Sequence, residues 1–266
     1  TDYYKVTLQD SNFNTLSSFE TGKDGTITAA VETAGVYWAI VQATDYYHTD
    51  NVYGLTASVS SQTGTVETEN NDTFATADDL SAGTQIQGQL SSSSDVDWFQ
   101  YTVTGAASLN LAFDLPSNSS YTDYFSIQIL EDGDTIYSGV ETGKDGSIKA
   151  SIDEAGTYYV KITSTDYYHD SGQYGLTLTE GSYDDNYEQE HNGYSNTNGS
   201  SSGTGTRLTN NQTMSGQLFD RSDTDFYYIN AAEPGSLTVL FDPLVDSSYT
   251  DYYKVTLQDS NFNTLS

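Results

Sequence analysis

The chain contains an identical internal repeat, and this feature limits its possible folds more than any other. Residues 1–17 read TDYYKVTLQDSNFNTLS, and residues 250–266 read the same letters. Residue 250 repeats residue 1, so the offset is 249 residues. Such identity does not arise by chance, and self-similarity at a fixed period is typical of repeat architectures. Because the chain begins in mid-pattern, we predict that it is an internal piece of a longer protein built from 249-residue units.

A weaker repeat lies inside this unit. Residues 20–29 (ETGKDGTITA) match residues 141–150 (ETGKDGSIKA) at an offset of 121. Residues 95–99 (DVDWF) match residues 223–227 (DTDFY) at an offset of 128. The offsets 121 and 128 sum to 249, so two homologous domains alternate along the parent chain. The extra seven residues fall at 191–206, a stretch whose composition is typical of a solvated loop.

These offsets predict three segments. Residues 66–180 form a complete domain, residues 184–266 form the N-terminal half of the next one, and residues 1–62 form the C-terminal half of one. Residues 1–17 and 250–266 match the same structural place, so both cannot fill it in one closed domain. We therefore expect each half to be completed by a neighbouring copy. The sequence leaves open whether that copy is covalently continuous or a separate subunit.

Hydrophobic residues recur with a period of two. Ile127 and Ile129 alternate with polar residues in SIQIL at 126–130, and Val255 and Leu257 do so near the C-terminal end. This period is typical of half-buried strands. Turn-forming stretches such as EDGD and GKDG separate the strands, and no convincing helix is present. The pattern predicts an all-β protein of tandem antiparallel, jelly-roll-like β-sandwich domains.

Composition excludes several classes of function. The chain has 38 acidic and 8 basic residues and a formal net charge of −30. This charge repels phosphate backbones, which argues against nucleic-acid binding, and favours cations. The absence of cysteine excludes disulfides and thiolate chemistry. No apolar run is long enough for a membrane helix. With no G-x-S-x-G motif and no phosphate-binding loop, we expect no catalytic activity.

Several motifs resemble those of a known family. In order they are ETENND at 67–72, ATADDL at 75–80, DVDWFQYTV at 95–103, EAGTYYVKI at 154–162 and YGLTL at 174–178. This series resembles the bacterial pre-peptidase C-terminal domain, a family that includes the collagen-binding modules of clostridial collagenases. The resemblance implies a jelly-roll-like sandwich in an extracellular protein, as an accessory or adhesive module rather than a catalyst.

The acidic lead-in before the first long strand is a candidate calcium site. Calcium takes six to eight hard oxygen ligands, and alternate residues of an extended segment project to one side. In the resembling modules, the lead-in and the following aspartates bind calcium. The corresponding residues here are Glu67, Glu69, Asn71, Asp72, Asp95 and Asp97 in the complete domain, and Glu188, Glu190, Asn192, Asp220 and Asp223 in the cut domain. Gly193 replaces Asp72 in the second set, so that site should be weaker. The alternative is that these acids are solvated turn residues.

Other features leave alternatives open. TDYYH occurs at 44–48 and at 165–169, either as an exposed tyrosine platform or as a strand end whose rings cover the core edge. Glycosylation sequons at Asn118, Asn198 and Asn211 do not establish modification.

The sequence thus favours a structural repeat of a long, bacterial, secreted or cell-surface fibre, filament or adhesin, with structural calcium stiffening its domains. Its expected partners are neighbouring copies of the repeat, and extracellular matrix or polysaccharide is a further possibility. The alternative is a collagen- or polysaccharide-binding accessory module of a secreted hydrolase. Many identical repeats in the parent chain would favour the fibre, and one or two copies beside a protease domain would favour the module.

Overall fold

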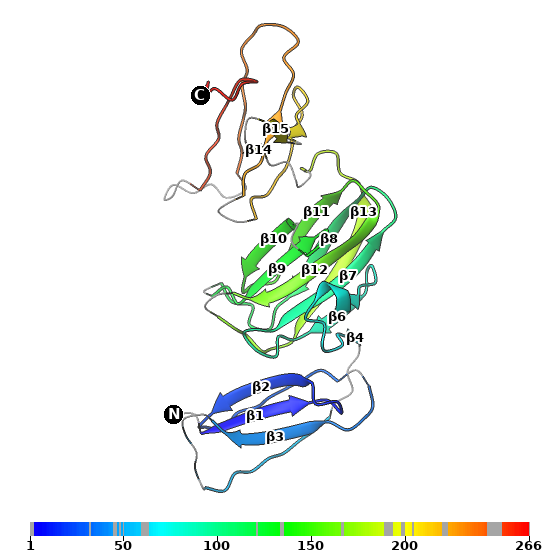
Figure 1. The fold of residues 1–266 in the computed structure, drawn as a ribbon, viewed down its shortest axis with the longest axis vertical. Coiled ribbons are helices and arrows are strands. Elements are labelled where there is room, and N and C mark those ends of the chain that lie inside the picture. The colour runs from blue at the N-terminus through cyan, green and yellow to red at the C-terminus, as the bar shows by residue number, and fades with distance from the viewer. Residues whose placement is uncertain are drawn as a thin grey trace. The chain divides into compact units, whose positions relative to one another are not determined.

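A computed structural model shows a chain whose regular secondary structure is β-strand, apart from one 3₁₀ turn, η1 (Phe74–Thr76), in the described residues (Figure 1). It forms two compact units, residues 1–229 and residues 230–266. The described residues are 3–31, 33–44, 47, 49, 51–59, 64–120, 122–133, 136–165, 168–188, 194–197, 200–203, 205–219, 223–243 and 252–265. Within them, no helix has the length and apolar character needed to cross a membrane.

The first unit contains a sandwich of two five-stranded sheets. One sheet consists of β5 (Asp78–Asp79), β7 (Val96–Val103), β9 (Phe125–Leu130), β10 (Ile136–Thr142) and β12 (Gly156–Ser164), in the order β10-β9-β12-β7-β5. The other consists of β4 (Thr65–Val66), β6 (Gln85–Gly88), β8 (Ala107–Asp114), β11 (Gly146–Ile152) and β13 (Tyr174–Ser182), in the order β11-β8-β13-β6-β4. The long strands pair antiparallel, whereas the short edge strands β4 and β5 pair in parallel with β6 and β7.

The predicted period of two accounts for the core of this sandwich. In β9, Ile127 and Ile129 are fully buried, while Ser126 and Gln128 between them are half-buried. Successive side chains of a strand point to opposite faces, so this alternation sends every second residue inward. The fully buried core residues from both sheets include Phe99, Leu109, Leu111, Ile127, Ile162 and Leu176. The predicted all-β sandwich is therefore confirmed.

The N-terminal segment forms a three-stranded sheet. Its strands are β1 (Tyr4–Gln9), β2 (Thr15–Thr21) and β3 (Trp38–Ala43), in the order β2-β1-β3. Shifted by 121 residues, these strands coincide with β9, β10 and the main part of β12, which lie in the same relative order. Residues 23–31 and 52–59, whose counterparts form β11 and β13, are not in strands. One sheet of a sandwich is thus partly built here, and the opposite sheet is not.

The segment after the sandwich has few strands in its described residues. β14 (Tyr194–Thr197) pairs antiparallel with β15 (Ser200–Gly203). β16 (Thr206–Arg207) pairs in parallel with β17 (Tyr227–Tyr228), which repeats the parallel β5–β7 pair at an offset of 128. In residues 230–266, the described part contains one isolated bridge, Gln258 with Thr264, and no strand.

Candidate metal centre

The lead-in that carries the acidic residues runs between the two sheets of the sandwich. It starts at β4, on the edge of one sheet, and ends at β5, on the edge of the other. The Glu67 amide donates to the Gln87 carbonyl at 2.9 Å, and the Trp98 amide donates to the Asn71 carbonyl at 3.1 Å. These main-chain bonds tie the lead-in to β6 at one end and to β7 at the other. They hold its alternate side chains against the start of β7.

Three carboxylates of the predicted set meet at this place. Glu67, Glu69 and Asp97 each offer an oxygen within 4.8 Å of the others. Asp97 and Asn71 are completely buried, and Glu67 is 6% exposed. The Asn71 amide nitrogen lies 3.5 Å from the Glu67 carboxylate. Glu67, Glu69 and Asn71 therefore point the same way, which is the arrangement expected of alternate residues in an extended lead-in.

Two buried oxygens of the cluster have no hydrogen-bond partner. They are Oδ1 of Asn71 and Oδ1 of Asp97. Other oxygens are held by donors: the Gln89 amide donates to Glu67 Oε1 at 2.6 Å, and the Tyr174 hydroxyl donates to Asp97 Oδ2. An unsatisfied buried acceptor costs free energy, and native proteins leave few of them. The two orphan oxygens are therefore available as ligands.

Burial and mutual repulsion raise the pKa values of these carboxyl groups. Burial raises the pKa of Glu67 well above its usual value, and the Glu69 charge adds to the effect. Burial, with the nearby charge of Asp95, raises the pKa of Glu69 to about 8. Burial and the Glu67 charge raise the pKa of Asp97 well above its usual value. The metal-free cluster thus retains protons near neutral pH, and a divalent cation would displace them.

The remaining predicted residues of this set lie at the rim. Asp95 is buried, and its carboxylate accepts from the amides of Ser91 and Val96 at 2.5 and 3.0 Å. Asp72 is exposed beside Asp95, and burial together with that neighbour raises the pKa of Asp72. These two carboxylates are outside the three-carboxylate cluster. They add negative charge near it.

The residues present fit a hard divalent cation. Carboxylate and amide oxygens without thiolate or imidazole are the ligand set of calcium or magnesium. In the described part of the chain, the single ion pair within salt-bridge distance joins Lys149 to Asp184, at 2.6 Å. No described lysine, arginine or histidine therefore neutralises the cluster by direct contact. Glu67, Glu69, Asn71 and Asp97 are the residues that could hold the ion.

The second predicted set is described only in part. Glu188 is 1% exposed and accepts from the Gln217 amide and from the Tyr227 hydroxyl. Asp223 accepts from the Phe219 amide at 2.9 Å, as Asp95 does from Ser91. Three members of the set lie outside the described residues: Glu190, Asn192 and Asp220.

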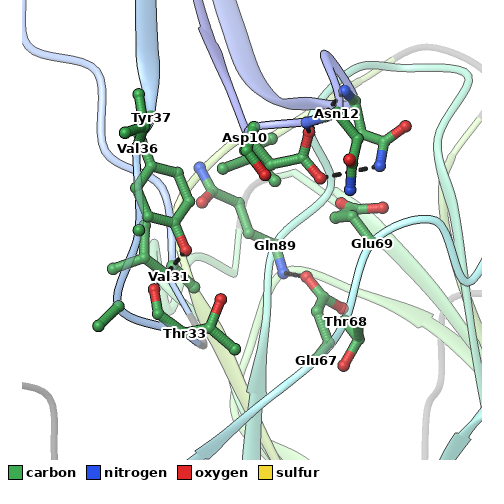
Figure 2. A pocket seen from close by; sticks show the side chains of 16 residues that line it. Asp10, Asn12, Val31, Thr33, Val36, Tyr37, Glu67, Thr68, Glu69 and Gln89 are labelled. Carbon is green, nitrogen blue, oxygen red and sulfur yellow. Dashed lines mark hydrogen bonds between the residues drawn. The ribbon is translucent and has the colours of Figure 1, made fainter.

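A cleft of about 320 Å³ lies beside the cluster (Figure 2). Asp10 and Asn12 of the β1–β2 turn line one side, while Glu67, Glu69 and Gln89 line another. The Gln89 side-chain nitrogen donates to Ser17 Oγ at 3.3 Å, to the Thr28 carbonyl at 2.7 Å and to the Ser171 carbonyl at 2.6 Å. Gln89 therefore connects the cluster to the N-terminal sheet, because its main-chain amide donates to Glu67 while its side chain contacts Ser17.

An equivalent glutamine–serine pair meets at the next junction, with the hydrogen bond running in the opposite direction. Gln217 is the counterpart of Gln89 at an offset of 128, and Ser138 is the counterpart of Ser17 at an offset of 121. The Ser138 hydroxyl donates to Gln217 Oε1 at 2.8 Å, and the Gln217 side-chain nitrogen donates to the Gly139 carbonyl at 2.9 Å. Each junction thus pairs a strand of the preceding segment with the glutamine that follows an acidic lead-in.

The tyrosines of the repeated TDYYH motif are half exposed where they are described. Tyr47 and Tyr168 are each 54% exposed. Tyr47 packs edge-on against Tyr3 with ring centres 6.1 Å apart, and Tyr168 packs likewise against Tyr124 at 6.2 Å. Each ring packs on a strand-end tyrosine, as expected of a strand end that covers the core edge. Each also presents a face to solvent, as expected of an exposed tyrosine platform. Their motif neighbours outside the described residues are Tyr46, His48 and Tyr167.

Sequence reasoning missed three residues that matter to the site. Tyr174 donates to Asp97 and, at 3.3 Å, to Glu67. Gln89 holds Glu67 and reaches the preceding sheet. Asp225 is the counterpart of Asp97 at the offset of 128. Tyr174 lies in YGLT, which occurs at 53–56 and 174–177, and Gln89 lies in GQL, which occurs at 88–90 and 216–218, so these repeats and the offset contain the signals that could have identified them.

No family model and no curated protein matches the chain. Among solved structures, it is similar to the pre-peptidase C-terminal domain of a collagenase from Bacillus anthracis. The TM-score is 0.32 and the identity 17%, over 39% of this chain and 94% of that one. It is also similar to PliG of Aeromonas hydrophila, a periplasmic inhibitor of g-type lysozyme, with a TM-score of 0.32 and 9% identity, over 39% of this chain and 95% of that one.

Proposed function

We propose that the chain is a non-catalytic structural repeat of a long secreted or cell-surface fibre or adhesin. In this proposal, calcium held by the acidic lead-ins stiffens the junctions between successive β-sandwich domains. The repeated contact of Gln89 with Ser17 and of Gln217 with Ser138 is the observation on which the proposal mainly depends. A junction built twice from equivalent side chains gives successive domains the same relation, which is what a regular fibre requires.

The acidic cluster supports a role for calcium at these junctions. Glu67 accepts from the Gln89 amide, and the Gln89 side chain reaches the N-terminal sheet. Without a cation, the raised pKa values of Glu67 and Glu69 show that ionisation of the cluster is costly. A bound calcium ion would remove this repulsion and immobilise Glu67. It would thereby hold Gln89 in position against the preceding segment.

Calcium titration of the complete chain tests the proposal. We expect isothermal calorimetry to show binding, and small-angle scattering to show a more extended, less variable particle with calcium than with a chelator. Glu69→Gln should lose both effects, because it removes a charged ligand with little change in shape. The matched control is Asp79→Asn, which should retain both calcium binding and the change in scattering. Asp79 is an exposed carboxylate in β5 that accepts from the Gln100 side chain at 2.9 Å. If calorimetry shows no calcium binding, the calcium role is overturned. It is also overturned if the chain binds calcium but its scattering is the same with calcium and with chelator.

A binding module of a secreted hydrolase is the second candidate, and the exposed rings of Tyr47 and Tyr168 favour it. Exposed tyrosines supply contact area at low entropic cost. Sedimentation with insoluble collagen and with polysaccharide separates the two candidates. Retention that Tyr47→Ala and Tyr168→Ala abolish would favour the module, and electron micrographs showing regular filaments without such retention would favour the fibre.

A further inference from the structure

The side-chain amide of Asn71 has two ends of opposite character, and its nitrogen lies between two carboxylates. This nitrogen is 3.5 Å from Glu67 Oε2 and 3.4 Å from Asp78 Oδ2. The other end, Asn71 Oδ1, is buried without a hydrogen-bond partner. An amide nitrogen donates hydrogen bonds, and only the amide oxygen can bind a cation. The orientation of the amide therefore decides whether Asn71 can serve as a ligand.

Asp78 opposes the reversed orientation of this amide. Reversal would bring the Asn71 oxygen against Asp78 Oδ2 and Glu67 Oε2, and acceptors in contact repel each other. Asn71 is completely buried, so water is not at hand to supply a donor between them. Glu67 is itself a candidate ligand, and a bound cation would draw on its oxygens. Asp78 would then be the acceptor that still holds the amide nitrogen.

The short strand β5 places Asp78 beside the lead-in. Asp78 lies opposite Phe99 in the parallel pairing of β5 with β7. Its Oδ2 accepts from the Thr68 amide at 2.6 Å as well as from Asn71. One carboxylate oxygen thus joins the start of the lead-in to its middle and closes residues 68–78 into a loop. Asp78 is not a member of the three-carboxylate cluster.

The other unpaired oxygen of the cluster is held in the same way. The Tyr174 hydroxyl donates to Asp97 Oδ2, and Asp97 Oδ1 is buried without a partner. In both groups, a residue outside the cluster engages one polar atom and leaves the second one for a ligand. Fixing ligands through such outer partners is a general property of metal sites, because it sets their orientation before the ion binds.

We propose that Asp78 is a positioning residue of the metal site. Its carboxylate holds the side-chain nitrogen of Asn71, and Asn71 Oδ1 thereby stays available to the cation. Asp78 does not itself bind the ion. This inference rests on the calcium-binding part of the proposed function, and it adds a residue that sets the affinity without touching the metal. Removing such an outer partner lowers metal affinity by about 10- to 100-fold.

A double-mutant cycle on the complete chain tests whether Asp78 acts through Asn71. Calorimetric titration measures calcium affinity in the unmodified chain, in Asp78→Ala, in Asn71→Ala and in the double variant. We expect Asp78→Ala to weaken binding by about 10- to 100-fold. The double variant should bind no more weakly than Asn71→Ala alone, because the amide that Asp78 positions is then absent. Circular dichroism and metal-free melting check that each variant is folded.

Two controls and a second readout separate positioning from a general loss of charge or of stability. Asp79→Ala removes the adjacent carboxylate of β5, which is bonded to Gln100 on the opposite face of the strand, and should keep the affinity. Asp78→Asn retains an acceptor oxygen and should lose about fivefold or less. Terbium bound in place of calcium reports its coordinated waters through luminescence lifetimes in H2O and D2O. Asp78→Ala should add about one water, because the Asn71 oxygen is lost as a ligand.

Several results would overturn the inference. Unchanged affinity and water count in a folded Asp78→Ala would do so while leaving the calcium role intact. Additive losses in the double variant, or an equal loss in Asp79→Ala, would show that Asp78 does not act through Asn71. An unmodified chain that binds no calcium would overturn both this inference and the calcium part of the proposed function. If Asp78→Ala does not fold, Asp78→Thr replaces it, because Thr206 occupies the equivalent place at an offset of 128.

Discussion

Glu69→Gln should stabilise the metal-free protein at pH 8, although it removes a charged group from a very acidic cluster. Burial and neighbouring carboxylates raise the pKa of Glu69 from 4.5 to about 8, a rise of about 3.5. At 1.36 kcal/mol for each pH unit, this corresponds to about 5 kcal/mol. Because the side chain is only partly buried, solvent screening reduces the expected gain to about 2 kcal/mol. For a sandwich of this size, the melting temperature should rise by about 8 °C.

The pH dependence has a definite sign. Well below pH 4.5, a carboxyl group whose pKa is raised in the folded state is protonated in both the folded and the unfolded chain, so it adds nothing to the pH dependence of stability there. Between pH 4.5 and about 8, the folded protein binds more protons than the unfolded one, so its stability falls as the pH rises. The metal-free chain should therefore melt at a lower temperature at pH 8 than at pH 5. Glu69→Gln should flatten this slope.

Calcium should reverse the trend, because it binds the ionised cluster. With one linked proton of pKa about 8, the apparent affinity should fall by about 50-fold from pH 8 to pH 6. Differential scanning calorimetry in chelator and calorimetric titration at the two pH values provide the measurements. Asp79→Asn is the control for removing one negative charge. A metal-free melting temperature that stays constant or rises from pH 5 to pH 8, or a lower one in Glu69→Gln, would refute the reasoning.

The other predictions concern the Tyr174 hydroxyl, the junction and the core. Tyr174→Phe removes a buried donor to two carboxylates and should cost about 1–3 kcal/mol in urea unfolding with calcium present; an unchanged midpoint would contradict this. Gln89→Ala should lower the melting temperature of the sandwich, because it removes the donor to the Ser171 carbonyl, and should also broaden the distance distribution in small-angle scattering; an unchanged distribution would argue against its junction role. Leu111→Ala should lower the free energy of unfolding by about 2–5 kcal/mol, and Val239→Ala should lower it far less, because Leu111 is buried and Val239 is half exposed. Equal losses of stability by calorimetry would contradict this difference in burial.

Part of the candidate site was predictable from local pattern. Alternation along the lead-in correctly anticipated that Glu67, Glu69 and Asn71 point the same way, because an extended backbone forces this over a few residues. Asp72, which the sequence analysis placed in the same ligand set, follows Asn71 directly and is exposed at the rim. The contribution of Tyr174 was not predictable, since it lies 107 residues from Glu67 in the chain. Only the pairing of β13 with β6 brings its hydroxyl to the cluster.

The 249-residue offset, the strand character and the acidic lead-in could be read from the amino-acid sequence alone, because repeated letters and period-two alternation are local properties. The tertiary structure decided which acids meet, since Asp97 joins Glu67 only when β7 lies beside the lead-in. It also decided that the same apolar pattern is buried at Leu111 and exposed at Val239. Burial depends on an opposite sheet contributed by distant residues, so a strand's own letters specify which face is apolar but not what covers it.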